Sequence, residues 1–397
     1  MTKHYFAQTL LLVFTIAFVL AGCSQDQSTA PDTSSLTSQK LSGIIEYKDV
    51  LITHYGDRPR AALEAAGAIV REEYKYIPVM EASVPAYALD ALRKNPKIRA
   101  IEEDVVHEYC QQTLDWGVDR IDAEYVHAES GNRGAGINVA VLDTGGDKDH
   151  PDLTWSPGTT VMGKDTTRWD DKNGHGTHCA GIISADDNDI GIVGVAPECD
   201  VIMVQISRAS RISLFKIIKG IEWCIATHHD GDEDNDVQIM SMSFSGGPTE
   251  AEGVALSAAY AEGILLVAAA GNSRSDVANY YPAAHPDVMA ISGIDAYGQA
   301  YYNTNYGEEI ELIAPAVNVL STYLEGSYTT MTGTSMACPH VAGTAALIWS
   351  DNPSMTHQQV RDQLHATAED ISFPQTYQGY GLVDAENATL GTTFGDD

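Results

Sequence analysis

The sequence predicts an α/β protein with a mostly parallel sheet, preceded by a small α+β domain. Ile137 to Leu142 is a mainly apolar run that ends in Asp143 and a glycine turn, which is typical of a buried parallel strand. A second apolar run at 264–267 ends shortly before Gly271-Asn272, and residues 337–349 favour a small, apolar helix. We therefore expect the larger part of the chain to form a parallel sheet covered by helices.

The residues after Gly43 change to a different pattern. Strands and helices are expected in the order strand, helix, strand, strand, helix, strand, which is the split βαββαβ motif. Pro85 fits the first turn of the second helix. The expected bounds are 44–53, 58–67, 69–76, 78–84, 85–95 and 97–107.

The composition is strongly acidic. The 397 residues carry 55 Asp and Glu against 23 Lys and Arg, a net charge of −32, and 44% are hydrophobic, enough for a sizeable core. Residues 110–397 hold 12 of the basic and 41 of the acidic side chains. Nucleic acid is therefore not expected as a partner. Calcium binding, a saline habitat and a generic acidic exported protein all fit this balance.

The N-terminus predicts export. Lys3 precedes an apolar run to Leu20 that is too short for a stable transmembrane helix. Leu20-Ala21-Gly22-Cys23 resembles the lipobox of bacterial lipoproteins, which implies cleavage before Cys23 and a membrane contact through lipid on its thiol; an ordinary signal peptide is the alternative. We expect a lipoprotein signal peptide at 1–22 and a disordered tether at 23–42.

Three segments carry candidate catalytic groups. Ser335 lies in Gly333-Thr334-Ser335-Met336-Ala337 at the start of the predicted apolar helix, where backbone N–H donors can stabilise an oxyanion. Taken alone, this serine could be an ordinary helix cap. Asp143 ends its strand, and His175 opens the small-residue run 173–181. Together they give an acid, a base and a nucleophile in an order known for serine hydrolases.

These motifs resemble those of the subtilisin-type serine proteases. Val-Leu-Asp-Thr-Gly, His-Gly-Thr-His-Cys-Ala-Gly and Gly-Thr-Ser-Met-Ala-Cys-Pro-His occur in the family order. The resemblance implies that Asp143 orients His175, that His175 is the general base and then acid, and that Ser335 attacks the carbonyl. It implies an oxyanion role for Asn272, which by itself would fit a plain turn. His178 is expected to be structural.

The family resemblance also implies the organisation of the chain. We expect a three-layer subtilisin-like fold at 110–397, and at 43–109 a ferredoxin-like inhibitory propeptide that is cleaved off after Tyr109. The product would be an exported monomeric endopeptidase acting on proteins and peptides, with its own propeptide as a further partner. A scaffold that has lost catalysis and a processing protease with few targets are the alternatives.

Calcium is the expected cofactor. The oxygen-rich loop 184–194 suits a hard cation, although a solvated acidic loop is the alternative. The resemblance assigns ligands by side chain or by carbonyl. These positions are Gln111, Asp152, Asp186, Asn188, Ile190 and Ile192. The acidic run 230–236 resembles a calcium loop only loosely.

The remaining predictions concern the state of the cysteines and two places where the sequence differs from the family pattern. Cys179 and Cys338 are expected as buried free thiols, and Cys199–Cys224 as a disulfide. The segment Ala314-Pro315-Ala316-Val317 carries alanine where the family usually has glycine. The segment 273–282 is shorter than in familiar subtilisins, which leaves side-chain preference open. Residues 243–247 match the strand that pairs with the substrate backbone.

Overall fold

The computed structural model describes residues 45–103 and 112–391, which belong to two compact units. The lipobox, the tether, the expected cleavage point and the predicted ligand Gln111 lie outside the described residues.

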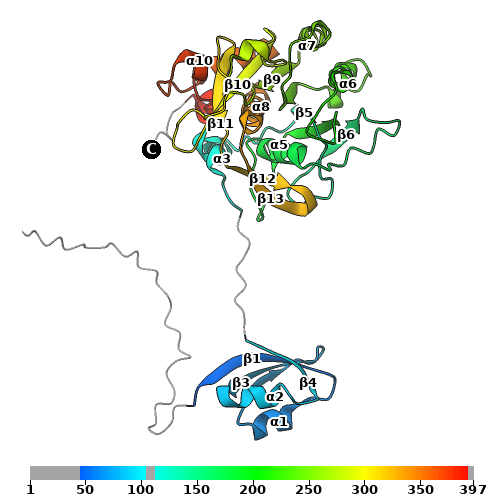
Figure 1. Cartoon of the computed structure of the whole chain (residues 1–397), viewed down its shortest axis with the longest axis vertical. Helices are drawn as coiled ribbons and strands as arrows, with labels where there is room; N and C mark the ends of the chain where they lie inside the picture. Colours follow the sequence, from blue (N-terminus) through cyan, green and yellow to red (C-terminus); the bar gives the residue numbers. More distant parts are fainter. Residues whose placement is uncertain (1–44, 104–111, 392–397) are drawn as a thin grey trace, which may run out of the picture. The chain divides into compact units, whose positions relative to one another are not determined.

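The smaller unit is a four-stranded antiparallel sheet in the order β2-β3-β1-β4 (Figure 1). Its strand and helix order is the predicted βαββαβ, and its core is apolar. The second helix is shorter than predicted, because Pro85 ends β3 in an extended conformation and a 3₁₀ turn follows. The bounds are β1 (Tyr47–His54), α1 (Arg60–Ala65), β2 (Ile69–Glu73), β3 (Val79–Pro85), η2 (Ala86–Ala88), α2 (Leu89–Leu92) and β4 (Ile98–Glu103).

The larger unit is built on a seven-stranded parallel sheet, which confirms the predicted three-layer α/β fold. Side chains alternate along the strands, so that Val139 and Val141 enter one core and Ala140 and Leu142 the other. The strands in sheet order are β11 (Ile310–Pro315), β10 (Val288–Ile294), β9 (Leu265–Ala269), β8 (Ile239–Met242), β5 (Asn138–Asp143), β7 (Asp200–Gln205) and β6 (Ser156–Thr160).

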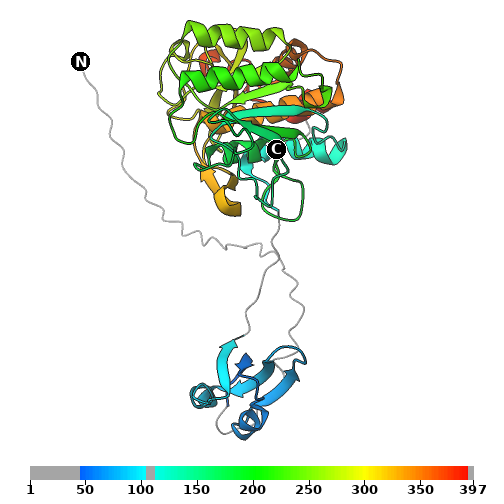
Figure 2. The same cartoon turned by 90° about the vertical axis from the view of Figure 1, so that its right-hand side faces the viewer.

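Helices cover both faces of this sheet. On one face α8 (Thr334–Asp351) is the central element, and nearly all of its residues are buried (Figure 1). It is joined there by α3 (Trp116–Arg120), α4 (Ala123–Glu129), α5 (His175–Ser184), α9 (His357–Thr367) and α11 (Ala385–Leu390). On the other face α6 (Leu214–Thr227) and α7 (Glu250–Ala261), the two green helices of Figure 2, lie side by side.

Short elements complete this unit. The hairpin β12–β13 packs beside α5, and the remaining helices are single turns. The bounds are β12 (Val319–Tyr323), β13 (Ser327–Met331), η3 (Glu233–Asn235), η4 (Val277–Asn279), η5 (Leu324–Gly326) and α10 (Gln375–Gln378).

The predicted Cys199–Cys224 disulfide is wrong. Both thiols are free and buried, as are those of Cys179 and Cys338, which were predicted so. Cys199 packs into the core that contains α8, whereas Cys224 on α6 packs into the core on the opposite face of the sheet. A disulfide needs Cα atoms within about 7 Å of each other, which two residues separated by a sheet cannot provide.

Candidate active site

Asp143 and His175 are placed by the ends of two buried elements. Asp143 is the last residue of β5, and His175 is the first residue of α5. His175 Nδ1 lies 2.8 and 2.9 Å from the two carboxylate oxygens of Asp143. The next residue must be a glycine, because a Cβ on Gly176 would collide with the carbonyl of Gly145. The small-residue motif thus lets α5 begin directly against the strand end.

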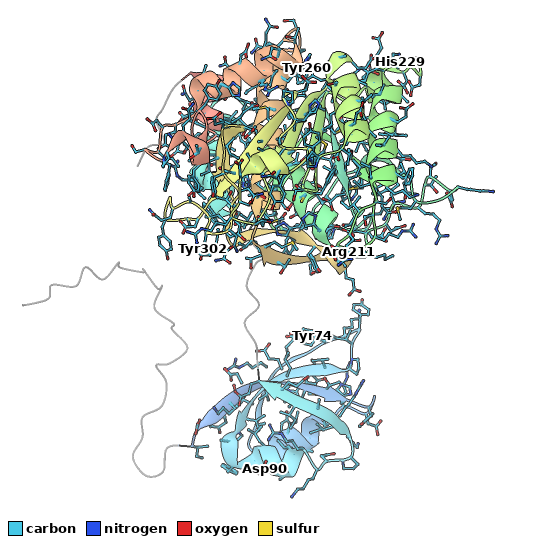
Figure 3. All side chains as sticks on the ribbon, turned by 45° about the horizontal axis from the view of Figure 1, so that its top comes forward. Tyr74, Asp90, Arg211, His229, Tyr260 and Tyr302 are labelled. Atoms are coloured by element: carbon cyan, nitrogen blue, oxygen red, sulfur yellow. The ribbon has the colours of Figure 1, made fainter. Side chains whose placement is uncertain are left out.

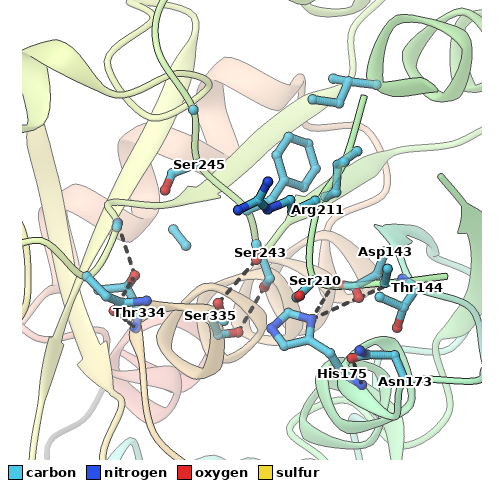
Figure 4. A pocket seen from close by; sticks show the side chains of 18 of the residues that line it. Asp143, Thr144, Asn173, His175, Ser210, Arg211, Ser243, Ser245, Thr334 and Ser335 are labelled. Atoms are coloured by element: carbon cyan, nitrogen blue, oxygen red, sulfur yellow. Dashed lines mark hydrogen bonds and ion pairs between the residues drawn. The ribbon is translucent and has the colours of Figure 1, made fainter. Parts of the chain in front are cut away.

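Ser335 lies in the first turn of α8, in the same cleft as Asp143 and His175 (Figure 4). The cleft has a volume of about 580 Å³. In this structure the Ser335 hydroxyl donates to the carbonyl of Ser243 at 3.1 Å. Hydrogen bonds between nucleophile and base are often long or unformed before a substrate is bound, so this geometry is that of a resting site.

Pro339 changes how the first turn of α8 is held. A proline has no N–H, so the carbonyl of Ser335, four residues earlier, receives no helical hydrogen bond from it. That carbonyl accepts instead from the Ser243 hydroxyl at 2.8 Å and from the Cys179 thiol at 3.5 Å. The backbone of the nucleophile is therefore tied to the segment after β8 and to α5.

Asn272 follows β9 and faces the N-terminus of α8. Its Oδ1 accepts from the N–H of Thr334 at 2.9 Å and from the Thr334 hydroxyl at 3.2 Å. Two acceptor contacts fix the orientation of the amide and leave Nδ2 as the donor on the other side. Gly333 makes room for it, since a Cβ there would lie 3.2 Å from Asn272 Nδ2. Asn272 and Ser335 line the same cleft, where Nδ2 can donate to a developing oxyanion.

The electrostatics of the site set the protonation of His175. Burial lowers the pKa of His175, but the negative charge of Asp143 and the neighbouring Cys179 together raise it well above its ordinary value. His178 behaves in the opposite way, because burial lowers its pKa to about 4 and its Nε2 contacts the carbonyl of Thr329 at 3.1 Å. His178 is thus a neutral, buried side chain that packs α5 against β13.

Comparison with known proteins agrees with this geometry. The profile of the Subtilase family matches residues 134–383, which include all four candidate catalytic residues. The chain belongs to the subtilase family. It is 33% identical to subtilisin NAT of Bacillus subtilis subsp. natto over 387 residues, covering 96% of this chain and 97% of the relative.

Two further relatives are closer in identity over a shorter region. A thermostable alkaline protease of Halalkalibacterium halodurans is 41% identical over 81% of this chain and 85% of its own length. An alkaline protease of Shouchella clausii is 39% identical over 80% of each. The subtilase is accordingly a serine endopeptidase that acts on protein or peptide substrates.

Of the predicted calcium ligands, Asp152 and those in the loop after α5 lie together, whereas Gln111 lies outside the described residues. Asp152 is fully buried, and its two carboxylate oxygens accept from Asn188 Nδ2 and from the N–H of Ile192, each at 2.9 Å. Burial raises the pKa of this carboxyl. Ile190 belongs to the same turn, since its N–H donates to Asn188 Oδ1 at 2.7 Å. Among the described residues, Asp152 has no ion pair with a basic side chain, so its buried charge suits a cation.

Gln112, which lies before α3, contacts this loop and was not singled out from the sequence. Its amide Nε2 lies 2.6 Å from the carbonyl of Asp186 and 2.9 Å from that of Ile192. These carbonyls therefore converge on one point, and the side chain of Gln112 occupies it. The bridge between Thr113 and Ile192 aligns the segment with the loop. This pairing brings Gln112 to the loop; the predicted ligand Gln111 lies outside the described residues and stays a prediction.

The second acidic run forms a turn held largely by its own contacts, but Asn235 Oδ1 is buried there without a hydrogen-bond partner. Asp230 Oδ1 accepts from the N–H of Asp232 at 2.9 Å, and Oδ2 accepts from Asn235 Nδ2 at 3.1 Å. The carbonyls of Asp234 and Asp236 accept from the amide of Asn138. These contacts account for the turn itself but give Asn235 Oδ1 no donor.

Proposed function

We propose that Ser335, His175, Asp143 and Asn272 are the catalytic residues of this endopeptidase. Ser335 Oγ attacks the carbonyl carbon of the scissile bond while His175 accepts its proton, and Asp143 holds the other ring nitrogen. Asn272 Nδ2 and the backbone N–H of Ser335 stabilise the oxyanion. His175 then protonates the leaving amine, which gives an acyl-enzyme. Water, activated by the same histidine, hydrolyses it.

One observation carries this proposal. The imidazole of His175 is held by both oxygens of Asp143 within a cleft that also contains Ser335 and Asn272. Rotation of the Ser335 hydroxyl away from the Ser243 carbonyl is the change needed before proton transfer to His175.

Labelling with a fluorophosphonate tests the mechanism against the alternative of a scaffold that has lost catalysis. The mature protein should incorporate the reagent once, on Ser335, and lose peptide hydrolysis in proportion. The variant Ser335→Ala should neither label nor hydrolyse. An unlabelled wild-type protein, or hydrolysis by the purified Ser335→Ala variant, would refute these assignments.

We also propose that the loop after α5 binds calcium. One carboxylate, one side-chain amide and converging carbonyls form an oxygen-rich donor set that suits a hard cation. Asp152, Asn188 and the carbonyls of Asp186, Ile190 and Ile192 would hold the ion, with Oε1 of Gln112 after rotation of its amide. Bound calcium would stabilise the loop and, through it, the end of α5.

The smaller unit is proposed to be an inhibitory propeptide, cleaved after Tyr109 by the enzyme itself. The alignment with subtilisin NAT supports this, because it covers 96% of the chain and so includes this unit. Export with lipid on Cys23 remains part of the proposal, and cleavage would leave that anchor on the propeptide. Among the described residues, no helix is long and apolar enough to cross a bilayer.

Cleavage and calcium binding should be coupled through Gln112. Before cleavage Tyr109 must lie at Ser335, and the three residues to Gln112 span at most about 10 Å. His175 opens α5 in the cleft and the calcium loop follows its last residue, Ser184; ten helical residues extend about 15 Å. Gln112 could then reach the loop only with its backbone and side chain both fully extended, so we expect it to join the loop after the bond is cut. Calcium titration should show weaker binding by the uncleaved Ser335→Ala precursor than by the mature enzyme; equal affinities would contradict the coupling.

A further inference from the structure

The cleft contains a carboxylate that no step of the proposed mechanism uses. Glu252 lies in the first turn of α7, and it lines the cleft together with Ser245, Gly246 and Ala269. The residue is only 3% exposed. Burying a charged carboxylate raises the free energy of the folded protein unless a partner compensates the charge, so Glu252 needs such a partner.

Capping of α7 does not account for Glu252. Thr249 and Glu252 have the spacing of a capping box, in which the glutamate accepts from the backbone N–H of the first residue. In α7 one half of the box is present, the 3.2 Å bond from the Glu252 N–H to the Thr249 hydroxyl. In α9 the equivalent pair, Thr356 and Gln359, forms both halves. The carboxylate of Glu252 therefore does not cap its own helix.

Within residues 45–103 and 112–391, no basic side chain compensates Glu252 either. Among the described residues, its carboxylate has no ion pair and no side-chain hydrogen bond, and burial alone raises its pKa to about 7. The basic side chain of Arg211 also lines the cleft, but that residue is exposed at the surface of the unit (Figure 3). A positively charged group entering the cleft would meet an uncompensated carboxylate.

We propose that Glu252 recognises the side chain of a lysine or arginine near the scissile bond of the substrate. This inference rests on the proposed function, because it assigns the cleft to peptide binding. Gly246 and Ala269 have small or no side chains, which leaves room for a long aliphatic stem. The 41 acidic against 12 basic residues in 110–397 also attract cationic peptides.

The first experiment determines at which substrate position, counted from the scissile bond, the enzyme recognises a positive charge. Wild-type enzyme digests a peptide library randomised on both sides of the cleavage point, and the products are sequenced by mass spectrometry. Lysine and arginine should be enriched at one position. Two fluorogenic peptides, identical except for lysine or norleucine there, then give a ratio of kcat/KM values. Norleucine keeps most of the aliphatic stem but has no charge.

Two substitutions test the assignment. Glu252→Gln should lower the lysine-to-norleucine ratio by about 10- to 100-fold, as expected for one lost charge-assisted hydrogen bond, while hydrolysis of the norleucine peptide persists. Glu250→Gln is the matched control, because Glu250 carries the same charge in the same turn but is exposed. Its ratio should equal that of the wild type. Fluorophosphonate titration normalises each preparation to active enzyme.

The outcomes separate this inference from the proposed function. A wild-type enzyme that labels on Ser335 but cleaves both peptides equally would overturn the role of Glu252 and leave the protease mechanism standing. An unchanged ratio in active Glu252→Gln would do the same. If Glu252→Gln fails to fold, a wild-type enzyme without a preference for lysine still overturns the inference.

Discussion

Replacing Gly191 by alanine is expected to weaken calcium binding through one steric contact. Gly191 has φ +58°, and a Cβ there would come closer than 3.0 Å to Asp152 Oδ2 and to the Tyr328 hydroxyl, a separation that real Cβ atoms do not show. The carboxylate must then move by about 1 Å to reach an ordinary contact distance. Metal–ligand distances tolerate deviations of only about 0.2 Å, so Asp152 would be lost or misplaced as a ligand.

The magnitude follows from the loss of one ligand. We expect the calcium affinity to fall at least about tenfold, which corresponds to about 1.4 kcal/mol. At a fixed calcium concentration well above Kd, the mature enzyme loses that amount of ligand-linked stability. For a unit of this size the unfolding temperature should then fall by about 2–3 °C. Alanine at positive φ adds a strain of about 1–2 kcal/mol that does not depend on calcium.

Gly298→Ala isolates that strain. Gly298 lies outside both acidic loops and has φ +69°, and a Cβ there would meet no atom within 4 Å. Both variants are titrated with calcium by isothermal calorimetry and melted with calcium and with chelator. The calcium-dependent part of the shift should occur in Gly191→Ala alone. Equal calcium affinities of Gly191→Ala and wild type would refute the assignment of this loop.

Three further outcomes are expected. Asn272→Leu should lower kcat by about 10²–10³ with little change in KM, because it removes a donor used in the transition state; an equal rise in KM would indicate a binding role instead. Since His175 must be neutral to accept a proton and its pKa is raised, kcat/KM should keep rising with pH well above 7, and a plateau already at pH 6 would contradict this. Finally, the unfolding temperature at saturating calcium should rise between 0.1 and 2 M sodium chloride, as screening weakens repulsion among acidic side chains; a steady fall would count against it.

The catalytic groups could be located from the sequence because each stands at an element boundary with a local signal. Asp143 ends an apolar strand, and His175 and Ser335 open helices rich in small residues. These signals are short-range, so the sequence carries them directly. The parallel sheet and the small N-terminal domain followed from apolar periodicity in the same way.

Predictions that needed long-range geometry were less successful. The face of the sheet on which Cys224 lies depends on how α6 packs. The sequence around Cys199 and Cys224 does not show that the two residues lie on opposite faces. Gln112 is recognised only through the pairing of its segment with the loop around Ile192. Glu252 has the sequence spacing of a helix cap, and its place in the cleft emerges only when α7 packs against the sheet.

Pro339 has a consequence for how the cleft opens. Because α8 cannot satisfy the Ser335 carbonyl by itself, any local unfolding that removes Ser243 or Cys179 also removes a hydrogen bond from the nucleophile's own peptide group. The two walls of the cleft and the nucleophile therefore belong to one cooperative unit, and fluctuations of the separate segments are coupled. An N–H at position 339 would let the helix close on its own carbonyl, so that the nucleophile could stay ordered while the substrate-binding segment frays.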